Sequence, residues 1–393
     1  MNCKSFSKKK DGYRFEMVII STHALLAKDG DYVLKGTGRE ILSFLKSKAV
    51  DYVIIQHPID GGLSSVIQFY KKGVITIKRI GLSWLPFPLR IFQEYIIDFY
   101  IVILLKGNIE LFIGINPLNG VMGNVLRRLG LAKKSIFYTA DYAHQRFNNL
   151  IMNSLYHFFD RVAAFGADEV WNVSSRIVKE REKQGIDKKK NFIVPNSPNL
   201  NIIKTGPYKK TNKYNLVIVS HIARAINFPL LLRVIKRLSE KYKKINLSII
   251  GTGPYEDEIK SLANKLSIED RVSFLGSKDH KNVIEILQNS GVGIALYANY
   301  SPWTQFGDSM KVREYLACGL PVIMTAVPST ADEVRDEEAG FVINPNEKEL
   351  IGALEIIFSD ENIYKKIRKN SLSLGKKYDI TKILNERLGF TIL

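Results

Sequence analysis

The sequence is poor in cysteine, with only Cys3 and Cys318 among 393 residues. A disulfide framework or a structural zinc site needs more thiols than this, so a reducing compartment is expected. Long apolar runs are also missing: the most apolar segment, residues 91–105, is interrupted by Glu94 and Asp98. A bilayer-spanning helix needs roughly 20 apolar residues. We therefore expect no membrane span.

The N-terminal segment, residues 1–17, has lysines but no apolar stretch and no cleavage site. Such a segment does not read as a secretory signal. Together with the low cysteine content, this predicts a cytoplasmic protein. Contact with the inner face of the cell membrane stays open at this point.

Acidic residues are outnumbered: 57 Lys and Arg stand against 39 Asp and Glu, for a net charge of +18, of which residues 1–195 carry +12. A basic N-terminal half suggests an anionic partner, such as a phospholipid surface or a lipid pyrophosphate, although a solvated lysine-rich surface would give the same count. No compact module of basic and aromatic residues is present, so nucleic acid is not expected as a partner.

Short apolar runs alternate with segments of helical period, and this alternation predicts parallel sheets crossed by helices. It occurs in two series, with strands expected at 17–21, 52–56, 110–115, 135–138 and 169–173, and then at 215–220, 246–251, 271–275, 293–296, 321–324 and 340–343. Residues 63–79 read as one or two further strands.

The two series predict an α/β protein with two Rossmann-like, doubly wound domains that face a central cleft. We expect domains at 1–198 and 199–375, with a C-terminal helix in 376–393 that packs back toward the first domain. In open α/β sheets ligands bind at the carboxyl ends of the strands, so the chemistry is expected in the cleft.

The most informative segment is 309–322, SMKVREYLACGLPV. Asp308 or Ser309 can cap a helix that starts near Met310. The backbone N–H groups of residues 309–311 and the charge of Lys311 would then form an anion site. Glu314, one turn later, could accept hydrogen bonds from ribose hydroxyls. An anion site with a nearby carboxylate predicts binding of a nucleoside diphosphate.

This segment resembles the helix of family 4 (group 1) glycosyltransferases of the GT-B fold that reads Pro-x-Lys-x-x-Glu-Tyr-x-Ala-x-Gly-x-Pro-Val. Further segments resemble that family in the same order, namely 195–196 (PN), 247–254 (LSIIGTGP), 271–276 (RVSFLG) and 331–343 (ADEVRDEEAGFVI). The resemblance covers most of the second domain and implies a divergent glycosyltransferase with its nucleotide-sugar site there and its acceptor site in the first domain.

The resemblance also implies roles for individual residues. The donor would be held by residues for the base (Phe274, Leu275), the ribose (Glu314), the diphosphate (Arg224, Ser309, Met310, Lys311) and the sugar (Phe306, Gly307, Asp308). Gly38, in the Gly-Thr-Gly-Arg segment 36–39, could belong to a glycine loop under the donor phosphates or to a plain tight turn. Asp141 and His144, in 138–147 (YTADYAHQRF), are the catalytic candidates, and His144 could also be structural.

Three features depart from the family pattern. Phe306 stands where the family has the first of two glutamates. The family's phosphate-binding Arg and Lys are replaced in register by His221 and by Ile226 or Asn227, which is why Arg224 is considered. The first domain also lacks the usual Gly-Gly opening loop. These departures leave open a non-catalytic GT-B subunit that binds a nucleotide or a partner protein.

We expect a metal-independent transferase without a cofactor other than its sugar donor, because none of the segments that resemble the family contains an Asp-x-Asp metal motif; the sequence has this spacing at Asp29-Gly30-Asp31, outside those segments. The resemblance implies retention of anomeric configuration; if transfer is inverting, Asp141 or His144 would be the base. The acceptor is expected to be a glycan or a polyprenyl-pyrophosphate-linked glycan. The aromatic segment 82–100 could lie on a membrane or belong to the core. A dehydrogenase is excluded because no Gly-x-Gly-x-x-Gly follows an opening strand.

Overall fold

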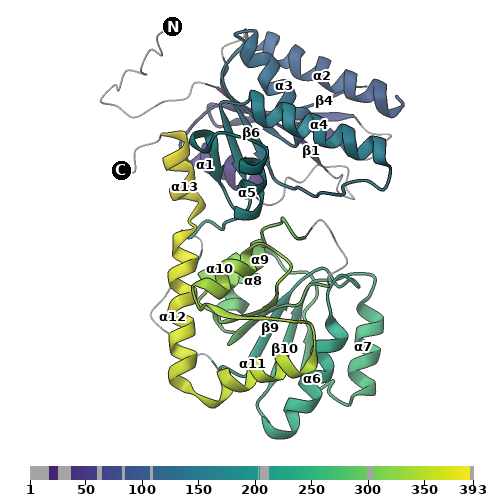
Figure 1. Ribbon diagram of the computed structural model, residues 1–393, viewed down its shortest axis with the longest axis vertical. Helices are drawn as coiled ribbons and strands as arrows, with labels where there is room; N and C mark the ends of the chain where they lie inside the picture. The colour runs from purple at the N-terminus through teal and green to yellow at the C-terminus, as the bar shows by residue number, and fades with distance from the viewer. Residues whose placement is uncertain are drawn as a thin grey trace. The chain divides into compact units, whose positions relative to one another are not determined.

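The computed structural model describes residues 17–24, 37–59, 64–81, 85–106, 109–201, 203, 212–298 and 304–389. The chain divides into two compact units (Figure 1). The N-terminal unit comprises Met1–Pro195 and Thr381–Leu393, and the C-terminal unit comprises Asn196–Ile380. The sequence placed the division at 198/199, and the last segment, from Thr381, belongs to the N-terminal unit.

The N-terminal unit is built on an eight-stranded sheet of order β4-β3-β2-β1-β5-β6-β7-β8. Its strands are β1 (Val18–Ala24), β2 (Tyr52–Pro58), β3 (Ser65–Lys71), β4 (Val74–Ile80), β5 (Ile109–Ile115), β6 (Ala132–Thr139), β7 (Glu169–Asn172) and β8 (Asn191–Ile193). All neighbouring pairs are parallel except β2–β3 and β3–β4, which are antiparallel; β3 and β4 form a hairpin at one edge. The hairpin turns at Lys72 and Gly73, both with positive φ, as a two-residue turn between twisted strands requires.

Three helices cover one face of this sheet: α2 (Phe87–Leu104), α3 (Pro117–Arg128) and α4 (Leu150–Gly166) (Figure 1). Apolar side chains of α2 and α3 pack on β1, β2 and β5, and those of α4 pack on β6 and β7. Helix α1 (Thr37–Ser47) joins β1 to β2 in the opposite direction across the sheet, so a right-handed crossover puts it on the other face. The remaining helices are α5 (Ser175–Lys183) and α13 (Ile380–Leu388), and Arg387 of α13 lies 4.0 Å above the ring of Phe192.

The C-terminal unit has a six-stranded, all-parallel sheet of order β11-β10-β9-β12-β13-β14. Its strands are β9 (Asn215–Val219), β10 (Asn246–Ile250), β11 (Val272–Phe274), β12 (Val292–Ala295), β13 (Val322–Thr325) and β14 (Gly340–Ile343). The chain runs from the centre to one edge and then returns to β12 beside β9. This order confirms the predicted doubly wound α/β fold, and its switch point between β9 and β12 is where such sheets bind ligands.

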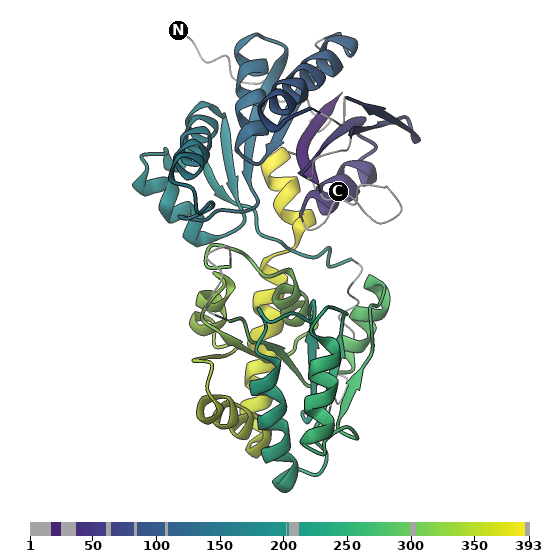
Figure 2. The same ribbon diagram turned by 90° about the vertical axis from the view of Figure 1, so that its right-hand side faces the viewer.

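Helices cover both faces of this sheet. One core contains α6 (Phe228–Lys241), α7 (Glu256–Lys265) and α11 (Glu347–Ser359), and the other contains α8 (His280–Gln288), α9 (Met310–Ala317) and α10 (Thr330–Asp336). The long helix α12 (Glu361–Lys377), yellow in Figure 2, packs against α9.

Two glycines let the loop after β10 touch the backbone that follows β9. A Cβ at Gly251, which has φ +134°, would lie 1.9 Å from the carbonyl oxygen of Ser220. A Cβ at Gly253 would lie 2.3 Å from the carbonyl oxygen of Ile222. The Gly-x-Gly pattern therefore reflects direct backbone packing beside the switch point.

We predict that Gly251→Ala lowers the free energy of unfolding of the C-terminal unit by about 2 to 4 kcal/mol, because the new methyl group meets backbone and φ is unfavourable. Gly352→Ala in α11 is the matched control: a Cβ there meets nothing within 4 Å. It should raise stability by up to about 1 kcal/mol through helix propensity. Urea unfolding followed by circular dichroism measures both, and an unchanged midpoint for Gly251→Ala would contradict the close approach.

Candidate donor site

The start of helix α9 lies at the switch point of the C-terminal sheet. Ser309 is its N-cap residue and accepts a hydrogen bond from the N–H of Val312 at 3.4 Å. The N–H of Ser309 itself donates to Thr330 Oγ1 at 3.1 Å. Of the three amides in the predicted anion site, that of Ser309 is therefore already used. The amides of Met310 and Lys311 lie in the first turn, where a helix supplies no acceptor.

Lys311 provides the positive charge at this helix start. Its ammonium group donates to Ser220 Oγ at 3.3 Å, directly after β9. The two residues line a small hollow of about 10 Å³ with Tyr297 and Tyr315, at the carboxyl ends of β9 and β12. Among the described residues, no carboxylate lies within salt-bridge distance of the Lys311 ammonium. Burial lowers the pKa of Lys311, and the charge of Glu314 opposes this only in part.

A cation that is desolvated without a carboxylate partner is a costly arrangement. An anion placed beside it would recover that cost. The predicted phosphate site at Lys311 and the first-turn amides stays a prediction, and a diphosphate would need more room than the hollow of about 10 Å³ provides.

Glu314 does not lie open in the site. Its side chain is buried, and Oε1 accepts a hydrogen bond from His280 Nε2 at 2.8 Å. His280, at the start of α8, is a partner that the sequence reasoning missed. Ribose hydroxyls would have to reach the second oxygen, Oε2, or replace His280, so the ribose role of Glu314 stays a prediction.

The predicted sugar-contacting segment faces the interior of the unit. Phe306 is buried, and the carbonyl group of Gly307 accepts a hydrogen bond from the N–H of Ser329 at 3.0 Å. The Asp308 carboxylate is fully buried and accepts hydrogen bonds from Arg313 at 2.8 Å and Thr330 at 2.9 Å. The prediction that Asp308 contacts the sugar is corrected, because its oxygens are committed to internal donors.

The predicted base-binding residues end strand β11. Phe274 is half-buried, with the ammonium group of Lys260 at 5.4 Å from its ring centre. The N–H of Leu275 donates to the carbonyl group of Ile249 at 2.9 Å. That amide extends the sheet, so a base at this position would be held through carbonyl oxygens.

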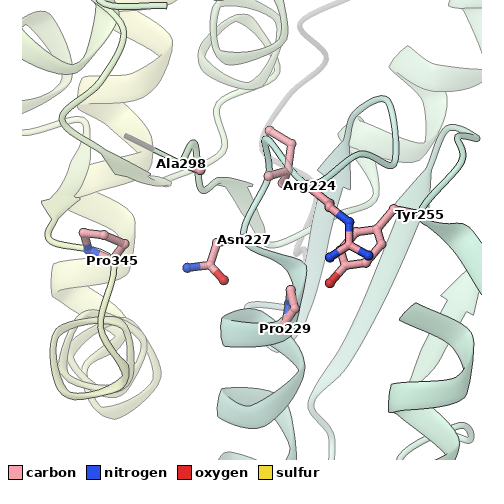
Figure 3. Close-up of a pocket in the computed structure, with 7 residues that line it drawn as sticks. Arg224, Asn227, Pro229, Tyr255, Ala298 and Pro345 are labelled. Atoms are coloured by element: carbon pink, nitrogen blue, oxygen red, sulfur yellow. The ribbon is translucent and has the colours of Figure 1, made fainter. Parts of the chain in front are cut away.

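Arg224 lines a different hollow, of about 280 Å³, on the α6 side of the sheet (Figure 3). Its guanidinium group stacks over Tyr255 at 4.6 Å and bonds both oxygens of Glu258 at 2.8 and 2.9 Å. Asn227, Pro229, Ala298 and Pro345 line the same hollow. It shares Ile226 with the hollow of Lys311. Arg224 is thus neutralised by Glu258, and its predicted phosphate role would require it to leave this pair.

The predicted site residues of the N-terminal unit lie on different elements. Gly38 is buried in the first turn of α1 rather than in a loop before it, and Gly36 lies outside the described residues. Asp141 and His144 lie in the loop after β6. Asp141 pairs with Arg146, whereas His144 is largely exposed with Nε2 3.9 Å from Glu180. The two catalytic candidates therefore have different partners.

The structure brings together a second group of titratable residues that the sequence reasoning missed. His57 Nε2 lies 3.1 Å from Asp98, with both side chains fully buried, and His23 Nε2 lies 3.1 Å from Glu94. Burial alone would lower the pKa of His57, but Asp98 and then Glu94 raise it above its ordinary value. The signal was present: Glu94 and Asp98 are four residues apart, so they share one face of an apolar helix.

Among the described residues, no group of three or more His, Cys, Asp or Glu side chains is arranged to hold a metal ion. In the same residues, no helix is long and apolar enough to cross a membrane.

Comparison with known proteins gives a family match for the C-terminal unit. Residues 202–373 match the family model for glycosyl transferases group 1. The C-terminal unit is therefore similar to the group 1 glycosyl transferases. An uncharacterized glycosyltransferase of Haemophilus influenzae is 29% identical over 204 residues, which are 51% of this chain and 55% of that protein.

Two further matches describe what similar proteins do. The Campylobacter jejuni N-acetylgalactosamine-N,N'-diacetylbacillosaminyl-diphospho-undecaprenol 4-alpha-N-acetylgalactosaminyltransferase is 26% identical over 179 residues, 45% of this chain and 46% of that enzyme. The chain thus spans about half the length of the curated relatives it matches. Anabaena HepE, solved in complex with UDP, has a TM-score of 0.67 at 12% identity, covering 95% of this chain and 98% of HepE. That likeness shows the GT-B fold.

We predict that affinity for UDP falls as pH rises, starting below the ordinary lysine pKa of about 10.4. The lowered pKa of Lys311 means that its ammonium group loses its proton earlier than an exposed lysine does, and only the charged form attracts a diphosphate. Calorimetric titration between pH 7 and 10 measures this. Lys311→Arg, which stays charged, should flatten the profile; an equally steep profile in that variant would contradict the assignment.

Proposed function

We propose that the protein is a glycosyltransferase that moves a sugar from a nucleoside-diphosphate sugar to a glycan or lipid-linked acceptor in surface glycan synthesis. One observation carries the proposal: the largely buried Lys311 ammonium group and the first-turn amides of α9 lie together at the switch point of a unit that matches the model for glycosyl transferases group 1. The UDP complex of HepE and the diphospho-undecaprenol acceptor in the name of the Campylobacter enzyme support this choice of donor and acceptor.

In the proposed reaction, the bond between the anomeric carbon and the donor phosphate oxygen breaks, an acceptor hydroxyl oxygen bonds to the anomeric carbon, and a nucleoside diphosphate leaves. Lys311 and the amides of Met310 and Lys311 would stabilise the negative charge that develops on the leaving oxygen. We propose that this electrostatic role replaces a metal ion. Retention of configuration, with the leaving phosphate taking the acceptor proton, is proposed from the family resemblance, and Asp141 or His144 remains the base in an inverting mechanism.

The acceptor would be presented at a membrane. The outward face of α2 consists of apolar residues that are 39% to 65% exposed: Leu89, Phe92, Ile96, Phe99, Tyr100, Ile103 and Leu104. Within the segment 82–100, Leu89, Phe92, Ile96, Phe99 and Tyr100 are exposed, whereas Ile97 packs in the core. A second apolar stripe follows α4, formed by Ile151, Leu155, Phe158, Val162 and Phe165. Monomeric proteins rarely expose such continuous apolar faces unless something covers them.

We propose that these faces contact an anionic bilayer from the cytoplasmic side. A chain with a net charge of +18 is repelled by a second copy of itself and attracted to anionic lipid. The apolar faces of α2 and α4 would then enter the interface, as interfacial helices do.

A non-catalytic GT-B subunit is the second candidate. Phe306 in place of a family glutamate and the pairing of Arg224 with Glu258 favour it, since both remove expected donor contacts. Such a subunit would bind the nucleotide without turnover.

An assay of donor hydrolysis or transfer separates the two candidates. With UDP- and GDP-sugars and bacterial lipid extract as the acceptor source, we expect nucleoside diphosphate release by the wild-type chain and a loss of about 100-fold or more in Lys311→Met. Lys366→Met is the control, because Lys366 is exposed in the same unit and pairs with Glu338 at 2.7 Å. Nucleotide binding without any release in the wild-type chain would favour the non-catalytic subunit.

Membrane contact is tested by co-sedimentation with vesicles of phosphatidylglycerol and phosphatidylcholine. We expect binding to vesicles rich in phosphatidylglycerol, weakened by salt, and about tenfold weaker in the double variant Phe92→Ser, Ile96→Ser because both side chains would leave the interface. Ile363→Ser, at an exposed apolar position of α12, is the matched control. Equal binding by the double variant would exclude α2 as the contact.

A further inference from the structure

A buried ionic cluster lies directly behind the start of α9. The guanidinium group of Arg313 donates to Asp308 at 2.8 Å and to both oxygens of Glu333 at 2.8 Å. Its side chain is 2% exposed, and that of Asp308 is fully buried. Thr330 Oγ1 donates to Asp308 and accepts from the N–H of Ser309. Ser309, the N-cap residue of α9, is thus held through Thr330 by the same Asp308 carboxylate that binds Arg313.

The chain passes between the two units twice, at Pro195–Asn196 and at Ile380–Thr381. Residues of the cluster contact the chain near both passages. At the first passage, Asn196 donates its backbone N–H to Asp308 Oδ2 at 2.8 Å and its side-chain N–H to the carbonyl group of Asp308 at 2.9 Å. At the second passage, the Tyr378 ring lies 4.1 Å from the Arg313 guanidinium group. The two passages also meet directly, since the N–H of Ile380 donates to the carbonyl group of Pro198 at 3.5 Å.

The carboxylate of Asp308, the residue before the N-cap of α9, therefore has hydrogen-bond partners on two sides. Toward the donor site it orders Ser309, which is followed at once by the open amides of Met310 and Lys311. Toward the chain passages it is the acceptor for Asn196. A diphosphate that orders the start of α9 would therefore also order the neighbouring segment that carries Asp308.

We propose that Asp308 and Arg313 are positioning residues that couple donor binding at Lys311 to the order of the passage at Asn196. The inference rests on the proposed function, because it takes a nucleoside diphosphate as the ligand of α9. Asp308 acts through Ser309 and Asn196 and does not touch the donor. A purely structural cluster would stabilise the C-terminal unit without responding to the nucleotide.

The N–H of Asn196 reports the coupling directly, because Pro195 and Pro198 have no amide proton and leave few signals in this segment. Hydrogen–deuterium exchange of the full-length chain is measured with and without UDP, or with GDP if UDP does not bind, alongside calorimetric titration. We expect saturating nucleotide to slow exchange at Asn196 about tenfold in the wild-type chain. In Lys311→Met the slowing should disappear together with nucleotide binding.

The variants separate coupling from stability. Asp308→Asn should exchange rapidly at Asn196 with or without nucleotide. If that variant does not fold, Asn196→Ala removes the side-chain bond to the carbonyl group of Asp308 and should weaken nucleotide binding about tenfold while the chain stays folded. Lys366→Ala, which breaks an exposed ion pair with Glu338, is the control and should match the wild-type chain.

Three results would overturn the inference. Nucleotide that binds without changing exchange at Asn196 would remove the coupling and leave the proposed function standing. Wild-type affinity in Asn196→Ala would do the same. If neither UDP nor GDP binds the wild-type chain, the proposed function and the inference fall together.

Discussion

The candidate donor site depends on one physical constraint: the Lys311 ammonium group is largely buried, and among the described residues no carboxylate pairs with it. Burial at the carboxyl ends of β9 and β12 lowers its pKa, and a serine hydroxyl rather than a carboxylate is its hydrogen-bond partner. A folded protein keeps such a charge only where the cost is recovered elsewhere. Here the recovery would come from an anion bound at the start of α9, where the helix also offers backbone amides.

The surrounding structure serves to hold this helix start in place. Gly251 and Gly253 allow the loop after β10 to pack on the backbone beside Ser220, which in turn bonds Lys311. On the other side, the cluster of Asp308, Arg313 and Thr330 fixes Ser309. The candidate donor site is therefore a frame of packed and hydrogen-bonded residues around one cation, and the sheet order explains why it lies at this position.

Much of this frame could be predicted from the sequence, because the fold follows from local periodicity and the cap of α9 from short-range spacing. The partners of the site residues could not, since each comes from a distant element: His280 for Glu314, Glu258 for Arg224 and Arg313 for Asp308. Side-chain direction at Asp308 decides between a sugar contact and an internal ion pair, and spacing does not encode it. Likewise, Glu94 and Asp98 looked like interruptions of an apolar run until the sheet placed two histidines beside them.

The central claim is tested most directly by the pKa of Lys311 itself, followed by NMR of the lysine side-chain nitrogen in the free chain and with saturating UDP or GDP. We predict a lowered pKa of Lys311 in the free protein and a clear rise when the nucleotide binds, because the diphosphate restores the favourable environment of the charged form. A pKa that does not move on nucleotide binding would contradict the account.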